Sequence, residues 1–432
     1  MRSCGWDNFH WRTLARRGGI CLNPAVRKHF CLLAVTTALL GKGWNAEAQL
    51  DPEKRALFEV GYNQALRGEQ PVAGYAYLYL NEPDYILTNT VLRLAIAPVY
   101  LDSELGFRNL LGPNTDVGFG IAGGGYADDY YELHEGKYLK DQSFHGHVAE
   151  GTFSVYHLFN PDQRIPLNGV FRVQEHYSFY APDQTADSFV LPRDHSTINL
   201  RTGLRWGGRP PVFHPDLAFE LAAWYEEQFR APSGPYGYSD DREVQKISGL
   251  YWGRALLIYT FPQSKQSFSV SLTGGGSIDP DRFDAYRIGG DLPLAAEYPL
   301  VLPGYFYQEL SARSFAAFTA EYSFPLDAAH RWTVSPIGTA AFVDYLPGLE
   351  QPGNFNSGLG VGVGYRSKTG MWQTFASYGY GFEAIRGNGR GGQSIAFMCQ
   401  VDLDARPGRT TLRPGNAPPQ PLSTFRFLRD LF

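Results

Sequence analysis

The sequence has few cysteines and no hydrophobic run long enough to form a membrane-spanning helix. Only four cysteines occur in 432 residues, and Cys4, Cys21 and Cys31 all lie within the first 31 positions. Cys399 alone remains further along the chain, which excludes an internal disulfide there. The longest apolar run, residues 31–40, is far below the ~18 residues that a spanning helix needs. These absences argue against a disulfide-stapled domain and against a helical membrane protein.

The first 48 residues have the composition of a secretion signal. Six basic residues precede the apolar run of residues 31–40, and the segment Ala46-Glu47-Ala48 then fits the A-x-A cleavage pattern. We therefore expect a mature chain that begins near Gln49. Because this leader carries seven basic and only two acidic residues, its removal changes the formal charge from −5 to about −10. Such a charge disfavours nucleic acid as a partner.

Beyond the leader, apolar and polar residues alternate with a period of two. In residues 216–230, for example, Leu217 and Phe219 would face one side of a strand, and Glu220 and Glu226 the other. Fourteen such segments, separated by turn residues, follow one another from position 72 to position 404. The sequence therefore predicts an all-β fold, an antiparallel transmembrane β-barrel of 14–16 strands in the cell outer membrane.

The same pattern predicts four parts of the chain. Residues 1–48 would be the signal peptide, and residues 49–71 a short periplasmic helical segment that starts at an Asp-Pro pair. Residues 72–404 would form the barrel, and residues 405–432 a proline-rich tail. No sizeable periplasmic domain is expected before the barrel.

Several motifs with chemical potential have simpler structural explanations. Residues 118–123 match G-x-G-x-x-G, but no helix follows them, so dinucleotide binding is not expected. His145 and His147 lie on one strand face without an obvious third ligand, which disfavours a metal site. No G-x-S-x-G motif occurs, and the acidic pairs at 128–129, 226–227 and 240–241 are read as solvated turn or strand residues. We expect no enzyme, no metal and no cofactor.

Glycines alternate along one predicted strand near the C-terminal end of the barrel. They stand at positions 358, 360, 362 and 364, between Leu359, Val361, Val363 and Tyr365. Because the glycines share one face of the strand, that face would be bare. We expect this bare inner face to leave room for a loop or another plug.

The connection formed by residues 281–310 is too long and too apolar for an exposed loop, so we expect it to fold into the barrel. It contains the segments Ile288-Gly289-Gly290 and Leu302-Pro303-Gly304-Tyr305. The next strand ends in Glu321-Tyr322-Ser323-Phe324-Pro325-Leu326, and five strands in all are predicted after Leu310.

These elements, in this order, resemble those of the bacterial surface-antigen barrels that include the BamA/TamA-type assembly factors. The resemblance implies a sixteen-strand barrel whose inward loop carries the motif Gly289, Gly290, Pro303, Gly304 and Tyr305. It also implies that the loop tip meets the barrel wall near Glu321 and an inward-facing Asp344. Pro303 stands where that family has its tip arginine, so Arg287 or Arg313 would have to supply the ion pair. The periplasmic repeat domains of the assembly members are not expected here.

Three functions remain open on this reading. The resemblance implies assembly or translocation of protein or lipid across the outer membrane, through a weak seam between residues 72–81 and 392–404. The alternative is a passive, porin-like channel that residues 281–310 constrict. A barrel enzyme acting on lipid would need a reactive Ser or His at the membrane edge. The expected partners are outer-membrane lipid, an unfolded protein or lipid substrate, and a separate periplasmic protein.

Overall fold

The computed structural model of the protein describes residues 50, 54–163, 165–208, 217–292 and 300–405. Within these ranges the regular secondary structure consists of β-strands and one 3-10 turn at Lys140–Gln142. None of the described residues belong to a helix long and apolar enough to span a membrane. The expected signal peptide and nearly all of the expected tail lie outside the described residues.

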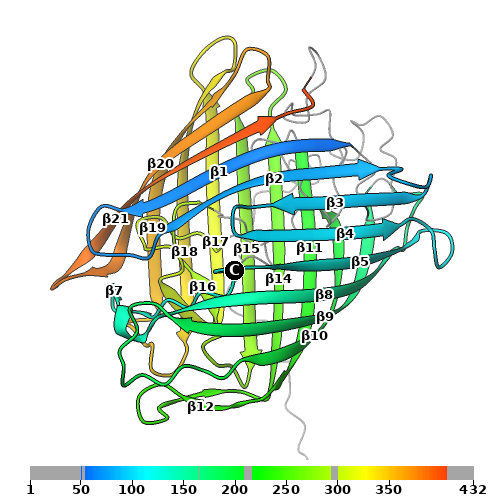
Figure 1. Cartoon of the computed structure of the whole chain (residues 1–432). Helices are drawn as coiled ribbons and strands as arrows, with labels where there is room; N and C mark the ends of the chain where they lie inside the picture. The colour runs from blue at the N-terminus through cyan, green and yellow to red at the C-terminus, as the bar shows by residue number, and fades with distance from the viewer. Residues whose placement is uncertain (1–49, 51–53, 164, 209–216, 293–299, 406–432) are drawn as a thin grey trace, which may run out of the picture. The chain divides into compact units, whose positions relative to one another are not determined.

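Sixteen strands of the described chain form one closed antiparallel barrel, coloured from blue to red in Figure 1. The wall strands are β1 (Arg55–Ala65), β2 (Ala73–Pro83), β3 (Thr90–Ile96), β4 (Tyr100–Phe107), β5 (Thr115–Gly124), β8 (Phe144–Leu158), β9 (Leu167–Pro182), β10 (His195–Gly208), β11 (Leu217–Ala231), β14 (Ile247–Thr260), β15 (Ser267–Ile278), β17 (Leu310–Pro325), β18 (Trp332–Tyr345), β19 (Phe355–Arg366), β20 (Trp372–Arg386) and β21 (Gly389–Asp402). Each pairs with its neighbour along the chain, and β1 pairs with β21 to close the barrel. The predicted all-β barrel is thus confirmed, at the upper limit of the expected strand number.

The first strand stands where the sequence predicted a helix. Residues 55–65 form β1, in which buried and more exposed positions alternate strictly, and Phe58 and Tyr62 lie on the exposed side. The Asp-Pro pair suggested a helix start, but β1 pairs with β2 over residues 55–63 and with β21 over residues 57–65, so backbone partners come from other strands and not from a helix. The barrel therefore begins at Arg55 and not near position 72.

The connections between strands differ in length at the two ends of the barrel. At the end where β1 begins, here called the turn end, short turns such as residues 84–89 and 108–114 join the strands. At the opposite end, here called the loop end, residues 125–143, 232–246 and 279–309 form longer connections with small strands of their own. These are β6 (Leu133–His134), β7 (Lys137–Tyr138), β12 (Gly234–Tyr236), β13 (Arg242–Val244) and β16 (Tyr286–Ile288).

The two faces of the wall have opposite chemistry. Large apolar side chains are exposed around the outside, including Phe119, Leu204, Leu272, Phe318 and Leu359. The inner face instead carries buried ion pairs between neighbouring strands: Arg93 Nη2 lies 3.1 Å from Asp102 Oδ2, Arg254 Nη2 lies 2.8 Å from Glu220 Oε2, and Arg201 pairs with Glu226. An apolar outside and a charged inside are what a transmembrane barrel requires.

Candidate functional site

The connection of residues 279–309 folds into the barrel, as predicted. Its strand β16 pairs with the first residues of β17, where Ile288 lies opposite Leu310 and Tyr286 opposite Ala312. The wall strand β15 pairs with β17 only from Ser314 onward. Beyond β16 the chain enters the interior, and Leu302, Tyr305 and Phe306 have no exposed surface. We call residues 289–292 and 300–308 the inner loop.

The glycine pair holds the two arms of the inner loop together. Gly290 accepts a backbone hydrogen bond from Leu302 at 3.0 Å, so the sequence motifs at 288–290 and 302–305 meet in space. Gly289 has φ +144°, and a Cβ there would lie 2.2 Å from the carbonyl oxygen of Phe306. Only glycine fits at that crossing. The structure therefore brings Gly289, Gly290, Pro303, Gly304 and Tyr305 into one compact unit.

The tip of the inner loop rests in a recess on the inner face of β19 and β20. A Cβ on Gly304, which has φ +84°, would lie 1.8 Å from the backbone nitrogen of Gly381. On the wall side, a Cβ on Gly358 would lie 2.3 Å from the carbonyl oxygen of Pro303, and one on Gly360 would lie 3.5 Å from Pro303 Cβ. The predicted bare face of this strand thus receives the loop at two of its glycines. Gly362 instead faces the ring of Phe375.

Polar contacts fix the tip to β20 and β21. The Gly304 N–H donates to Ser394 Oγ at 3.0 Å and to Asp291 Oδ1 at 3.2 Å. The Gly304 carbonyl accepts from Arg386 Nη2 at 3.2 Å. Both nitrogens of that guanidinium also donate to Glu309, at 2.8 Å each, and both side chains are almost fully buried. A two-pronged buried ion pair of this kind depends on both partners, since one left alone would be a buried unpaired charge.

The wall residues that the family resemblance implied do not touch the tip. In β18, Ala341, Val343 and Tyr345 face the interior, so Asp344 lies on the outside next to the exposed Phe342. Asp344 accepts from Arg313 Nη2 at 2.7 Å, and both side chains are about half exposed.

Glu321 does face the interior, but its carboxylate accepts from Ser323 Oγ at 3.1 Å. Arg287 donates to the carbonyl of Arg282 at 3.3 Å. The ion pair at the tip comes from Glu309 and Arg386, and the sequence reasoning named neither residue. No local pattern in the sequence singles out either residue.

Burial changes the acidity of one carboxylate in the inner loop. Asp291 is 6% exposed, and this burial raises its pKa to about 6. Hydrogen bonds from Ser394, from the Gly304 N–H and from Asn63 oppose the shift because they favour the charged form.

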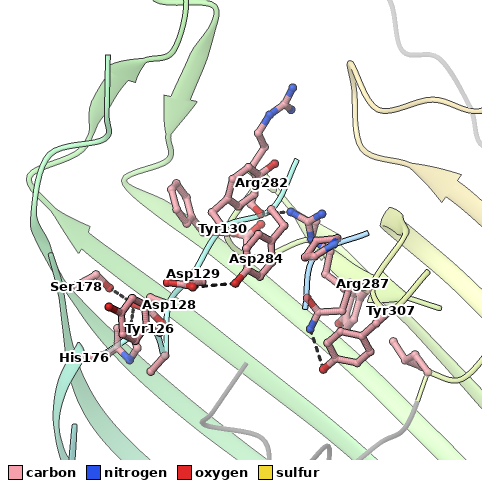
Figure 2. A pocket seen from close by; sticks show the side chains of 18 of the residues that line it. Tyr126, Asp128, Asp129, Tyr130, His176, Ser178, Arg282, Asp284, Arg287 and Tyr307 are labelled. Carbon is pink, nitrogen blue, oxygen red and sulfur yellow. Dashed lines mark hydrogen bonds and ion pairs between the residues drawn. The ribbon is translucent and has the colours of Figure 1, made fainter. Parts of the chain in front are cut away.

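A cavity of about 870 Å³, lined by both charged and apolar side chains, lies between the inner loop and the inner face of the wall. Figure 2 shows Asp128, His176 and Ser178 on one side of it, and Arg287 and Tyr307 of the loop on the other. His176 Nε2 lies 2.6 Å from Asp128 Oδ2, and its Nδ1 lies 2.7 Å from Glu150 Oε1. Asp128 therefore takes part in a partly buried network with His176 and Glu150, whereas the sequence suggested a solvated turn residue.

The two histidines singled out in the sequence lie close by. His145 Nδ1 is 3.1 Å from Asp129 Oδ2, whereas His147 Nδ1 accepts from the Tyr126 N–H at 3.2 Å. No group of three or more metal-ligating side chains is found among the described residues.

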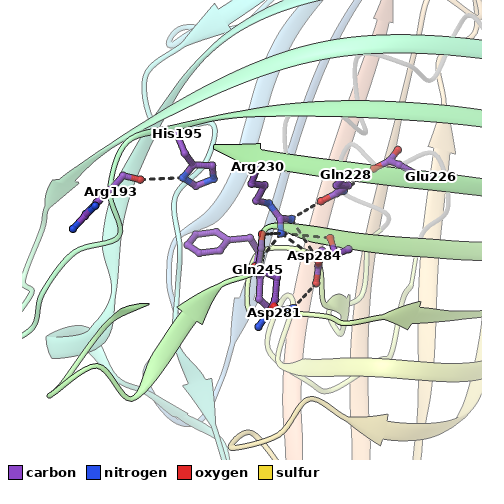
Figure 3. A network of polar contacts seen from close by, with 10 residues as sticks. Arg193, His195, Glu226, Gln228, Arg230, Gln245, Asp281 and Asp284 are labelled. Atoms are coloured by element: carbon purple, nitrogen blue, oxygen red, sulfur yellow. Dashed lines mark hydrogen bonds and ion pairs between the residues drawn. The ribbon is translucent and has the colours of Figure 1, made fainter. Parts of the chain in front are cut away.

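The base of the long connection is anchored by a second buried network, shown in Figure 3. Arg230 Nη1 donates to Asp281 Oδ2 at 2.9 Å, and Arg230 Nη2 lies 3.4 Å from Asp284 Oδ2. Burial, followed by the neighbouring charge of Asp281, raises the pKa of Asp284. The Gln245 N–H donates to Asp281 at 2.8 Å, so the network also reaches the neighbouring connection.

An aromatic cluster joins four connections at the loop end. Tyr130, Phe189, Tyr236 and Phe283 each come from a different connection, and they pack together with Phe144 of β8. These contacts hold the loop-end connections to one another and to the wall.

The closing seam is formed by a different pair of strands from the one expected from the sequence. Residues 73–83 form β2, which pairs with β1 and β3, so β1 and not β2 borders the last strand. Nine residues of β1, from Leu57 to Ala65, lie opposite nine residues of β21. The β2–β3 pair has only six such positions. The seam thus has as many opposed positions as the β1–β2 pair beside it, and fewer than the twelve of the β20–β21 pair on its other side.

Together, the barrel and its inner loop define a class: a sixteen-strand barrel of the outer-membrane type with a connection folded into the lumen. Comparison of the sequence with models of known protein families and with curated proteins finds no match. Solved structures do match. CdiB from Acinetobacter baumannii is similar with a TM-score of 0.52 and 11% identity, over 81% of this chain and 60% of that chain.

Two further structures give the same picture. BamA from Haemophilus ducreyi lacking POTRA domains 1–3 is similar with a TM-score of 0.52 and 10% identity, over 82% of this chain and 70% of that chain. CdiB from Escherichia coli is similar with a TM-score of 0.52 and 11% identity, over 82% and 63%. The chain thus spans less than two thirds of the length of either CdiB. At these identities the likeness shows the fold, and at that level the resemblance to BamA-type barrels is confirmed.

Proposed function

We propose that the protein is an outer-membrane barrel that inserts or translocates protein or lipid, working through its closing seam and not through an open pore. The observation that carries this proposal is the inner loop, whose tip is buried in a recess of the wall beside the last strands. A loop that only narrowed a pore would need no such recess. The barrel fold shared with BamA and CdiB supports the same reading.

The outer surface supports a membrane location. Exposed apolar side chains occur on strands all around the barrel, among them Phe58, Phe171, Leu257 and Phe382. Lipid is therefore one proposed partner, and an unfolded protein or a lipid is the proposed substrate. A separate periplasmic protein is proposed as a further partner. No chemical step is part of the proposal, which treats the protein as a non-enzyme.

A passive channel is the second candidate, and the charged residues that line the cavity favour it. The cavity is lined by charged groups of the wall and the loop, which would set ion selectivity in a pore. The aromatic cluster argues against an open channel, because it packs four loop-end connections against one another.

The test compares two activities of the same purified barrel. Planar-bilayer recordings measure conductance, and liposomes containing the barrel are given an unfolded outer-membrane protein whose protected fraction is then measured. We expect low conductance and faster insertion of the client than in liposomes without the barrel. High, steady conductance without faster insertion would contradict the proposal and favour the channel. Gel mobility with and without heating first shows that the barrel is folded.

A further inference from the structure

The closing seam is bridged by side chains as well as by backbone pairs. On the inner face, Gln400 Nε2 of β21 donates to Glu59 Oε2 of β1 at 2.7 Å. The opposite oxygen of Glu59 accepts from Tyr75 of β2 at 2.6 Å, while Gln400 itself accepts from Gln373 of β20 at 3.1 Å. One chain of polar contacts therefore runs from β20 across the seam to β2.

The inner loop lies over this seam and touches both of its sides. On the side of β20 and β21 it is held by Ser394 and Arg386, as described above. On the other side, Phe306 packs with Ala65 of β1, and a Cβ on Gly68, just past β1, would lie 2.8 Å from Phe306 Cζ. Asn63 of β1 is fully buried, and a Cβ on Gly290 would lie 3.6 Å from its Nδ2.

The apolar contacts of the inner loop straddle the seam in the same way. Leu292 packs in one cluster with Ala73 of β2 and with Ala396 and Met398 of β21, and Tyr307 borders the same cluster. The strands on either side of the seam thus share one buried surface of the loop. Separating β1 from β21 would expose that surface to water, in addition to breaking nine backbone pairs.

We propose that the inner loop is a latch for the seam: β1 and β21 separate only after residues 302–308 leave their recess. The inference deepens the proposed function, because it names what controls opening of the seam through which a substrate would pass. The Arg386–Glu309 pair and the fit of Gly304 against Gly381 are two fastenings of different physical kinds, and the hydrogen bond from Arg386 to the Gly304 carbonyl connects them.

Hydrogen exchange of the full barrel in lipid nanodiscs tests the latch without any substrate, so it does not depend on insertion activity. In the unaltered protein, amides of Leu57–Ala65 should exchange no faster than amides of residues 302–308. Faster exchange at the seam than at the tip would overturn the proposal at once, because the seam would then open while the latch is closed. This first measurement needs no variant.

Two variants then release the tip by different physical means. Arg386→Gln removes the ion pair, and Gly304→Ala places a methyl group against the Gly381 backbone. Each should speed exchange of the seam amides by at least about tenfold while leaving β9 and β10 unchanged. A tip that exchanges faster while the seam amides keep their original rate would overturn the latch.

Matched controls separate release of the tip from general damage. Arg313→Gln removes an arginine–carboxylate pair from the outside of the wall, where it touches no part of the inner loop. Gly348→Ala imposes the same backbone strain as Gly304→Ala, since φ is +83°, but the nearest atom to its Cβ would be 3.5 Å away. Both should leave seam exchange within about twofold of the original rate. If the control variants speed exchange of the seam amides as much as the tip variants do, the proposal fails.

Discussion

Val60 of β1 and Cys399 of β21 lie directly opposite each other across the closing seam. Cys399 is the only cysteine among the described residues, and it is partly exposed on the outer side of its strand. Val60→Cys would therefore create a single thiol pair across the seam. A short bifunctional thiol reagent should join β1 to β21, and under the proposed function it should abolish client insertion.

The control is Val60→Ser treated with the same reagent, which should insert clients at the normal rate. Removing the link with a reductant, where a cleavable reagent is used, should restore activity. A cross-linked barrel that inserts clients as fast as the uncross-linked one would show that the seam has no part in insertion.

The Arg386–Glu309 pair should contribute strongly to stability. Arg386→Gln leaves the Glu309 carboxylate buried without its cation, and we expect a loss of about 3–5 kcal/mol in the free energy of unfolding. Urea titration of the barrel in detergent micelles measures this loss. Because Arg313 and Asp344 are about half exposed, Arg313→Gln should cost no more than about 1 kcal/mol. Equal losses in the two variants would contradict the structural difference between the pairs.

Docking of the inner loop should weaken as the pH rises from 4 to 6. Asp291 has a pKa of about 6 in the folded protein, above the ordinary value of 3.8, so the folded state holds the proton more tightly. The stabilising effect of the Asp291 proton is complete at pH values below the ordinary pKa of 3.8. It is lost as the pH rises through the pKa of Asp291 in the folded protein, about 6. Asp291→Asn, which stays uncharged, should remove this dependence and stabilise the protein at pH 7 by about 2–3 kcal/mol.

Thermal unfolding at pH 4, 5, 6 and 7, followed by intrinsic fluorescence, measures this difference between the two proteins. Taking the difference cancels the titration of the other carboxylates. If Asp291→Asn shifts the midpoint equally at all four pH values, Asp291 does not titrate in this window.

A charge on the outer face should destabilise the barrel in a bilayer. Phe318 of β17 is 50% exposed on the outside, and its nearest neighbours on that face of the strand are Ala316 and Ala320. Phe318→Arg should cost about 2–4 kcal/mol if the position lies near the middle of the membrane. Leu110→Arg changes a similarly exposed residue in a turn, and it should cost less than about 1 kcal/mol. The free energy of unfolding in lipid vesicles is measured for both variants. If Phe318→Arg leaves this free energy unchanged, the outer face at Phe318 does not lie in the hydrocarbon of the bilayer.

The sequence predicted the barrel well because its signal is repeated in every strand. Alternation places Leu217 and Phe219 on one face and Glu220 on the other whatever the neighbours are, and the inward position of the 281–310 connection followed from its length and apolar content. The glycines at 358 and 360 also marked a recess, because a missing side chain on an inner face leaves space that something else must fill.

The predictions that failed concern features that depend on tertiary contacts. Residues 55–65 follow an Asp-Pro pair at positions 51–52 that is typical of helix starts, yet pairing with β2 and β21 makes them a strand. Asp344 was assigned to the inner face from a family pattern. In β18, however, Ala341 and Val343 face the interior, so alternation places Asp344 on the outside. The partner of Glu309 lies 77 positions away, at Arg386, and no local pattern connects two such residues.

The wall of the barrel is uneven in height. β3 has seven residues and β4 eight, whereas β9 has sixteen, and apolar side chains continue from the short strands into the turns at Ile86, Leu87 and Leu111. A bilayer around the protein would have to be thinner beside β3 and β4 than beside β9, with its headgroups drawn toward those turns. Lipid packing would therefore be most disturbed two strands away from the seam.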